Sequence, residues 1–142
     1  MNTSLGRLIA ILHRNKQMYL NARLKPYGIT SAEVGILMSL YREEGRTQEE
    51  LSQWLHIDKA ATTRTVHTLE EKGIITRKHD EKDRRCNRIH LTERGKALES
   101  SVVPVVRGWS EHISKLAGED TYNRLCSDLE AIFTALKEEP AQ

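Results

Sequence analysis

The stretch from Thr47 to Leu91 decides the fold, and it reads TQEELSQWLHIDKAATTRTVHTLEEKGIITRKHDEKDRRCNRIHL. Its first four residues form a capping box, in which the Thr47 hydroxyl and the Glu50 carboxylate each accept a hydrogen bond from an otherwise unpaired backbone N–H. A short helix should follow, with its apolar positions at Leu51, Trp54 and Leu55. Ile57 is then expected to anchor a tight turn.

A second helix should begin at Asp58, a favourable N-cap, and run through Lys72 to a stop at Gly73. Its buried side is predicted by residues that recur with helical spacing, namely Thr62, Val66 and Leu69. The opposite face then carries Lys59, Ala60, Thr63, Arg64 and His67. Two helices joined by a tight turn predict a helix-turn-helix, whose second helix enters a DNA major groove.

On such a face, Arg64 could pair with guanine, and Thr63 could touch a thymine methyl group or a phosphate. Taken alone, the pattern suits a charged, solvent-facing helix equally well. The residues after Gly73 favour the DNA-binding interpretation. The segments 74–79 and 87–92 have the composition of β-strands, and the charged residues 80–85 between them are typical of a hairpin tip.

A helix-turn-helix followed by a hairpin predicts a winged helix. Basic charge is concentrated there: residues 72–90 hold seven basic and three acidic residues, a net charge of +4, whereas residues 91–142 carry a net charge of −3. The formal charge of the whole chain is only +2, which does not by itself indicate nucleic-acid binding. The local charge on the wing is what a phosphate-binding edge requires.

With these motifs in order, the sequence resembles the MarR family of bacterial transcriptional regulators. The resemblance extends over nearly the whole chain and rests on Ile57-Asp58-Lys59, Thr63-Arg64, Leu69-Glu70-Glu71-Lys72-Gly73, Asp83-Arg84-Arg85 and Leu91-Thr92-Glu93-Arg94-Gly95. It implies a mainly α fold, a winged helix-turn-helix with a two-stranded wing and long terminal dimerisation helices. Within one chain of residues 1–142, we expect residues 30–92 to form the DNA-binding lobe, and residues 1–25 and 93–138 to form a helical dimerisation lobe.

The function that the resemblance implies is a sequence-specific DNA-binding transcriptional regulator. Such a protein would be a ligand-responsive homodimeric repressor that binds a palindromic operator in double-stranded DNA. In the wing, the resemblance implies that Asp83 orients a neighbouring arginine and that Arg85, with Arg84 and Lys82 beside it, reaches the DNA. The alternative for this tip is a solvated turn with a local ion pair of little energetic value.

The flanking sequence predicts further helices. The first should run from about Ser4 to Lys25 and present Leu5, Leu8, Ile9, Leu12, Tyr19 and Leu24 on one side. A second should start at the capping box Thr30–Glu33, a third should follow Thr92 and bend at Pro104, and a last should span about 119–137. These apolar faces exceed what one small core can bury, so the surplus favours packing against a second copy of the chain.

An effector site is implied only by the resemblance, because small phenolic or anionic compounds bind such regulators where the dimer helices meet the DNA-binding lobe. The aromatic and imidazole side chains expected near that junction are Tyr19, Tyr27, Tyr41, Trp109 and His112. Ordinary core packing explains these residues equally well.

Other classes of function find no support in the sequence. The histidines lack metal-ligand spacing, and no catalytic motif or glycine-rich phosphate loop is present, so we expect no enzyme activity, no metal and no cofactor. The two cysteines suggest a reducing, cytoplasmic environment, and the apolar run 8–12 is too short for a signal peptide or a membrane span. We expect Cys126 to be buried and Cys86 to be a small strand residue.

Two alternatives of other classes remain open at this point. A winged helix can serve as a protein-interaction module without binding DNA. An enzyme could use Cys86 as its nucleophile, because Arg84 and Arg85 would lower the pKa of that thiol.

Overall fold

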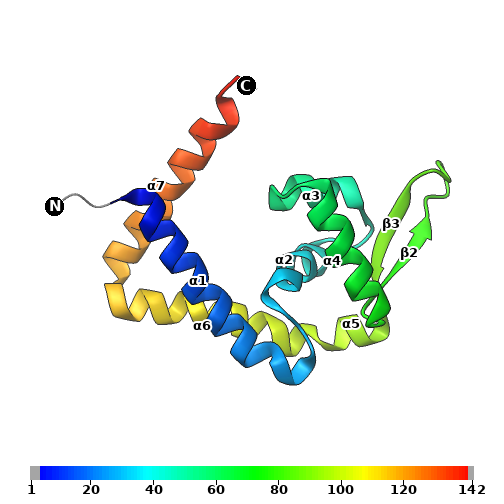
Figure 1. Ribbon diagram of the computed structural model, residues 1–142, viewed down its shortest axis with the longest axis horizontal. Helices are drawn as coiled ribbons and strands as arrows, with labels where there is room; N and C mark the ends of the chain where they lie inside the picture. Colours follow the sequence, from blue (N-terminus) through cyan, green and yellow to red (C-terminus); the bar gives the residue numbers. More distant parts are fainter. Residues whose placement is uncertain (1–3, 141–142) are drawn as a thin grey trace. The chain divides into compact units, whose positions relative to one another are not determined.

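Within residues 4–140, which the computed structural model describes, the chain forms helices and one small antiparallel sheet (Figure 1). The elements are α1 (Leu5–Leu24), the 3-10 helix η1 (Lys25–Tyr27), α2 (Ser31–Arg42), β1 (Arg46–Thr47), α3 (Gln48–Leu55), α4 (Lys59–Glu71), β2 (Ile75–His79), β3 (Asn87–Leu91), α5 (Glu93–Ala97), α6 (Glu99–Ala117) and α7 (Glu119–Glu138). Two compact units divide after Val106, inside α6. None of the described helices is long and apolar enough to cross a membrane.

The core of the first unit lies where α2, α3, α4 and the sheet converge. Its fully buried side chains come from all of these elements and include Leu37, Leu40, Leu51, Val66, Leu69, Ile74 and Ile89. Thr62 is buried beside them, and its hydroxyl oxygen accepts a hydrogen bond of 2.8 Å from Ser52 Oγ. The predicted buried side of α4, Thr62, Val66 and Leu69, is therefore confirmed.

The sheet has three strands in the order β1-β3-β2: the predicted two-stranded wing, β2 and β3, is confirmed, and β1 is a strand that the sequence did not predict. The wing hairpin pairs Ile75 with Leu91 at its base and His79 with Asn87 at its far end. The additional strand β1 pairs Arg46 with Ile89, and the Gly45 N–H donates to the Ile89 carbonyl at 2.9 Å. Two residues are too few to show the alternation by which a strand is recognised in a sequence.

The helix predicted to follow Thr92 is broken at Leu98, into α5 and α6, while Pro104 lies inside α6. The short α5 packs tightly against the start of the wing: a Cβ at Gly95 would lie 2.2 Å from the Ile74 carbonyl oxygen. The Thr92 hydroxyl donates to the Gly73 carbonyl at 2.6 Å and holds the same corner. These two contacts hold α5 against the start of the wing.

Two of the apolar residues at the end of α3 and in the turn that follows it are exposed. Trp54 and Ile57 are 46% and 40% exposed, so neither is a core residue. Trp54 instead lies against the guanidinium groups of Arg42 and Arg46, at 5.1 and 4.8 Å from the ring centroid. His56 closes the turn in the left-handed conformation, with φ of 55°, a region in which histidine is more frequent than most residues.

The terminal helices keep most of their apolar side chains exposed. In α1 only Leu20 and Leu24 are buried, whereas the predicted core positions Leu5, Leu8, Ile9 and Leu12 are exposed. In the second unit, α7 has no buried residue, and Leu125, Leu129, Ile132, Phe133 and Leu136 are exposed. Cys126 is exposed as well, so the prediction that it is buried is wrong for the single chain.

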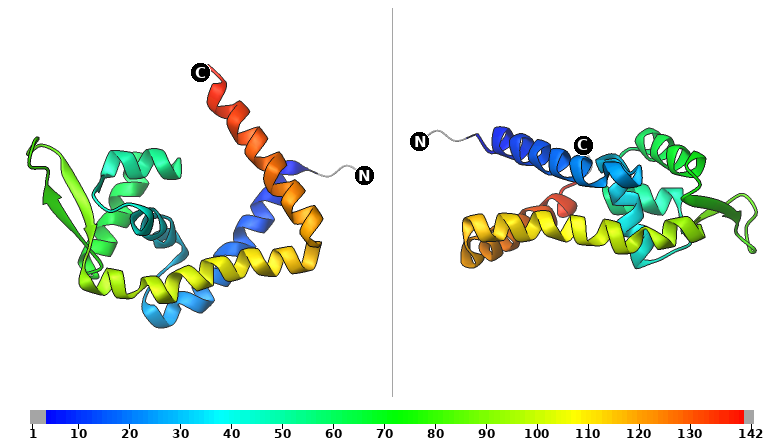
Figure 2. Two further views of the ribbon diagram at one scale, coloured as in Figure 1. Left: turned by 180° about the vertical axis from the view of Figure 1, so that it is seen from behind. Right: turned by 90° about the horizontal axis from the view of Figure 1, so that it is seen from below.

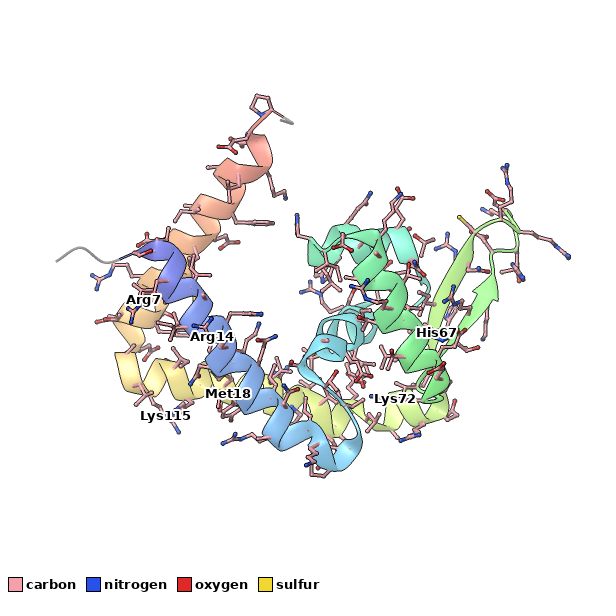
Figure 3. The ribbon with its side chains drawn as sticks, in the orientation of Figure 1. Arg7, Arg14, Met18, His67, Lys72 and Lys115 are labelled. Atoms are coloured by element: carbon pink, nitrogen blue, oxygen red, sulfur yellow. The ribbon has the colours of Figure 1, made fainter. Side chains whose placement is uncertain are left out.

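One ion pair connects the end of α4 with the start of α2. Lys72 Nζ lies 2.7 and 2.9 Å from the two carboxylate oxygens of Glu33, which is only 2% exposed, and it also donates to the Gly28 carbonyl at 2.8 Å. Glu33 further accepts hydrogen bonds from the Thr30 N–H and hydroxyl. Figure 3 shows Lys72 at the end of α4, and Arg94 of α5 donates to the Lys72 carbonyl at 2.8 Å.

Replacing Lys72 with Met should lower the free energy of unfolding by about 3 kcal/mol, because the buried Glu33 carboxylate loses its cation. Urea denaturation at one fixed protein concentration measures this loss. The matched control is Lys96→Met, which breaks the exposed Lys96–Glu93 pair and should change stability by less than about 1 kcal/mol. Equal losses in the two variants would contradict the structural role assigned to Lys72.

Candidate nucleic-acid interface

The helix α4 exposes the five residues that the sequence assigned to its outer face. Lys59, Ala60, Thr63, Arg64 and His67 are all solvent-exposed. The orientation of α4 follows from its ends, because Asp58 Oδ1 accepts the Ala61 N–H at 2.7 Å and Gly73 ends the helix with φ of 73°. Figure 3 shows His67 on this helix.

These side chains differ in how far they are already engaged within the protein. In residues 4–140 Arg64 forms no ion pair, and it lines a groove between α4 and the start of α2. His67 Nε2 lies 2.8 Å from Glu71 Oε1. Arg64 is therefore the residue of this face whose guanidinium is available for a planar acceptor such as a guanine edge.

The Thr63 hydroxyl is occupied by two partners. It donates to the Lys59 carbonyl at 2.7 Å, and its oxygen accepts a hydrogen bond from Gln48 Nε2 of α3. Gln48 could not be assigned to this face from the sequence, because the periodicity of α4 carries no information about a side chain on another helix. This contact brings Gln48 to the edge of the exposed face.

The wing presents a second group of polar side chains, and its tip projects beyond the helices of its unit in each view (Figures 1 and 2). Asp83 Oδ1 accepts the Arg85 backbone N–H at 3.0 Å and Arg85 Nε at 3.2 Å. The Arg85 side chain is nevertheless 93% exposed. Lys82 and Arg84 are also exposed, so the tip offers three cations to solvent.

Arg88, one residue from the far end of the hairpin, connects the wing to its surroundings. Its Nε donates to Asp80 Oδ2 at 3.0 Å, and its Nη1 donates to the Gly45 carbonyl at 2.8 Å, which connects the hairpin to β1. The Lys82 backbone N–H and, to a smaller extent, the Arg88 guanidinium hold the pKa of the Asp80 carboxyl below its usual value. Asp80 is thus ionised at neutral pH, and the hairpin keeps its shape through charged hydrogen bonds.

The structure offers little for other kinds of chemistry. Among the described residues, no group of three or more His, Cys, Asp or Glu side chains is arranged to hold a metal ion. Cys86 is half-buried, and its backbone helps to close the wing turn through the Asp83 and Asp80 hydrogen bonds. This backbone role is consistent with a small structural residue.

The five residues predicted to line an effector site have different surroundings. The Tyr41 hydroxyl donates a hydrogen bond to the Gly95 carbonyl at 2.9 Å. The Arg23 guanidinium stacks on the Tyr19 ring at 3.5 Å from the ring centroid. Tyr27 is 40% exposed. Trp109 and His112 belong to the second unit. The effector site therefore stays a prediction.

Comparison with known proteins gives consistent results. A model of the MarR family matches residues 29–87. A MarR transcriptional regulator from Methanosarcina mazei Go1 is 38% identical, with 95% of this chain and 98% of that chain covered and a TM-score of 0.85. A mutant MarR from E. coli complexed with operator DNA is 29% identical, with 90% and 92% covered and a TM-score of 0.83. The HTH-type transcriptional regulator BilQ of Clostridioides difficile (strain CD3) is 29% identical over 96% of this chain and 94% of its own length.

Tyr41 allows a prediction about alkaline pH. Burial, with a smaller contribution from the Glu99 carboxylate, raises the pKa of Tyr41 to about 12. The unfolded chain releases this proton near pH 10, so the stability that the neutral phenol contributes should be lost between about pH 10 and 12. Urea denaturation across this range should show a steeper loss for the wild type than for Tyr41→Phe. Tyr27→Phe, which removes the same hydroxyl from a ring that is 40% exposed, is the matched control. Parallel curves for the wild type and Tyr41→Phe would contradict the assignment.

Proposed function

This chain belongs to the MarR family of transcriptional regulators, and we propose that it acts as a homodimeric repressor that binds a palindromic operator. The observation that carries the proposal is the exposed face of α4 with an unpaired Arg64, beside a projecting basic wing in the same unit. A mutant MarR from E. coli that is similar over most of the chain was solved with operator DNA, which supports DNA as the partner. The response to a small aromatic or anionic effector rests on family membership alone.

In this proposal, the residues of α4 have different tasks. Arg64 makes bidentate contacts with a guanine edge in the major groove, whereas Lys59, at the first position of α4, contacts phosphate. Because the Thr63 hydroxyl is engaged within the protein, Thr63 presents its methyl group to the DNA. Ala60 permits close approach, and His67 lies at the periphery with Glu71.

The wing supplies contacts outside the major groove. Arg85 is oriented by Asp83 and extends into solvent, as an arginine that probes a minor groove must. Lys82 and Arg84 at the same tip can neutralise phosphates on either side. A protein-interaction module would not need three exposed cations at this tip, so the charge pattern favours DNA.

Dimerisation is supported by the apolar side chains that the terminal helices leave exposed. In α1, Leu5 and Ile9 are 60% and 52% exposed, and in α7, Ile132 and Leu136 are 49% and 58% exposed. Such continuous apolar faces are unusual on a soluble monomer and are expected to be buried against a second copy. Two copies would present two recognition helices, which is the requirement for reading a palindrome.

Selection of binding sites from randomised duplexes tests the proposed reading of DNA. The wild type should select a palindrome with half-sites about one helical turn apart. Arg64→Ala should lose about 1–3 kcal/mol of discrimination at one position in each half-site, because the guanine contact is removed. Lys59→Ala should keep the consensus but weaken binding to all sequences. The slope of the logarithm of the binding constant against the logarithm of the salt concentration should become shallower by about one released ion per half-site.

Arg124→Ala, which removes an exposed arginine of α7, is the control and should bind like the wild type. If Arg64→Ala keeps the full consensus and loses only affinity, Arg64 contacts phosphate rather than a base. If the wild type selects no palindrome, the proposed mode of operator recognition is wrong.

Charge on the apolar face of α7 should disrupt the dimer. Leu129→Glu should raise the dissociation constant of the dimer by roughly tenfold or more, because a carboxylate would be buried at the interface. Ser127→Glu adds the same charge on the opposite side of the helix and should leave the dimer intact. Light scattering over a range of concentrations measures both, and a wild type that is monomeric at micromolar concentration would refute the assembly.

A further inference from the structure

Gln48 lies at the edge of the proposed DNA-binding face although it belongs to α3. It is the first residue of α3, and its backbone is fixed by the capping box around it. The Thr47 hydroxyl accepts the Glu50 N–H at 3.1 Å, and Glu50 Oε2 accepts the Thr47 N–H at 3.2 Å. The Gln48 side chain therefore extends from a fixed backbone position.

The contact between Gln48 and Thr63 determines which way the amide points. The proton of the Thr63 hydroxyl is directed to the Lys59 carbonyl at 2.7 Å, so the Thr63 oxygen can only accept a bond from Gln48. The Gln48 amide must therefore turn its NH2 group, Nε2, toward Thr63. One N–H and the carbonyl oxygen of the amide remain, and in the part of the chain that the structure describes neither has a protein partner.

From this geometry we propose that Gln48 contacts a DNA phosphate through its remaining N–H and thereby joins the recognition helix to the DNA backbone. The proposal rests on the DNA-binding function proposed above. The first helix of a helix-turn-helix crosses the DNA backbone while the second enters the groove, so a phosphate oxygen is the acceptor that α3 meets. Neutral amide donors are common among phosphate contacts.

The neighbouring acidic residues do not prevent this contact. The Glu50 carboxylate is occupied by the capping box. Glu49 follows Gln48 on the helix and therefore points about 100° away from it. Gln48 is thus a positioning residue as well as a contact, because the same amide holds the Thr63 hydroxyl and the phosphate.

Substitutions at Gln48 separate a phosphate contact from a purely structural role. Binding is measured at several salt concentrations on the duplex that the wild type selects and on a scrambled duplex of equal length. Gln48→Ala should weaken binding to both by about 3- to 10-fold per half-site, the value of one hydrogen bond. The salt dependence of DNA binding by Gln48→Ala should match that of the wild type, because the neutral amide that the substitution removes displaces no counterion from the DNA.

Two charged variants provide the decisive readouts. Gln48→Lys should restore binding, because lysine keeps a hydrogen-bond donor at this position. It should also make the slope of log K against log salt concentration steeper by about one released ion per half-site, because it adds a positive charge beside a phosphate. Gln48→Glu should bind more weakly than Gln48→Ala, because the carboxylate is repelled. In the Gln48→Ala background, Thr63→Val should cause little further loss, since the two residues act as a unit.

The matched control is Gln53→Ala, which removes the same side chain from an exposed position of α3 and should bind like the wild type. The proposal is overturned if Gln48→Ala binds as tightly as Gln53→Ala, or if Gln48→Lys leaves the salt dependence unchanged. A wild type that selects no duplex from the randomised pool would instead refute the DNA-binding function itself, which distinguishes the two failures.

Discussion

The buried carboxylate of Glu33 is the constraint on which the position of α4 depends. An ionised carboxylate removed from water is several kcal/mol unfavourable unless a cation and hydrogen-bond donors surround it. Lys72 supplies that cation from the end of α4, while Thr30 supplies two donors from the start of α2. The helix α4 cannot move away from α2 without leaving Glu33 uncompensated. Arg94, which donates to the Lys72 carbonyl, connects α5 to the same point.

Hydrogen bonds to the hydroxyl groups of Thr62 and Thr63 fix the rotation of α4 about its axis near its start. This rotation determines which residues of α4 face the solvent. Burial of Val66 and Leu69 favours contact with the core but is not directional, so it tolerates some rotation of the helix about its axis. Hydrogen bonds from Ser52 to Thr62 and from Gln48 to Thr63 do not tolerate such rotation. The two polar contacts with α3, together with the Lys72 ion pair, therefore hold Arg64 on the exposed face.

The parts of this architecture that could be predicted from sequence are those encoded by residues close together in the chain. The capping boxes, the end of α4 at Gly73 and the buried side of α4 follow from local spacing, and the structure confirms them. The close approach of Gly95 in α5 to Ile74 could not be predicted, because the two residues lie 21 positions apart in the chain. The position of Gln48 also depends on a distant residue, since Thr63 lies 15 positions away.

The wing contains an arginine whose side chain is partly oriented before binding. Immobilising an exposed arginine side chain on binding normally costs about 0.5–1.5 kcal/mol of free energy. In the proposed complex, Asp83 reduces this loss for Arg85 by holding Nε at 3.2 Å, a contact that does not involve the terminal Nη groups. Because the contact is made through Nε, the proposed entry of Arg85 into a narrow groove does not require this contact to break. The carboxylate therefore lowers the net charge of the tip but raises the fraction of molecules in which Arg85 is ready to bind. An acidic residue at a DNA-binding edge is favourable when the orientation it provides is worth more than the attraction it removes.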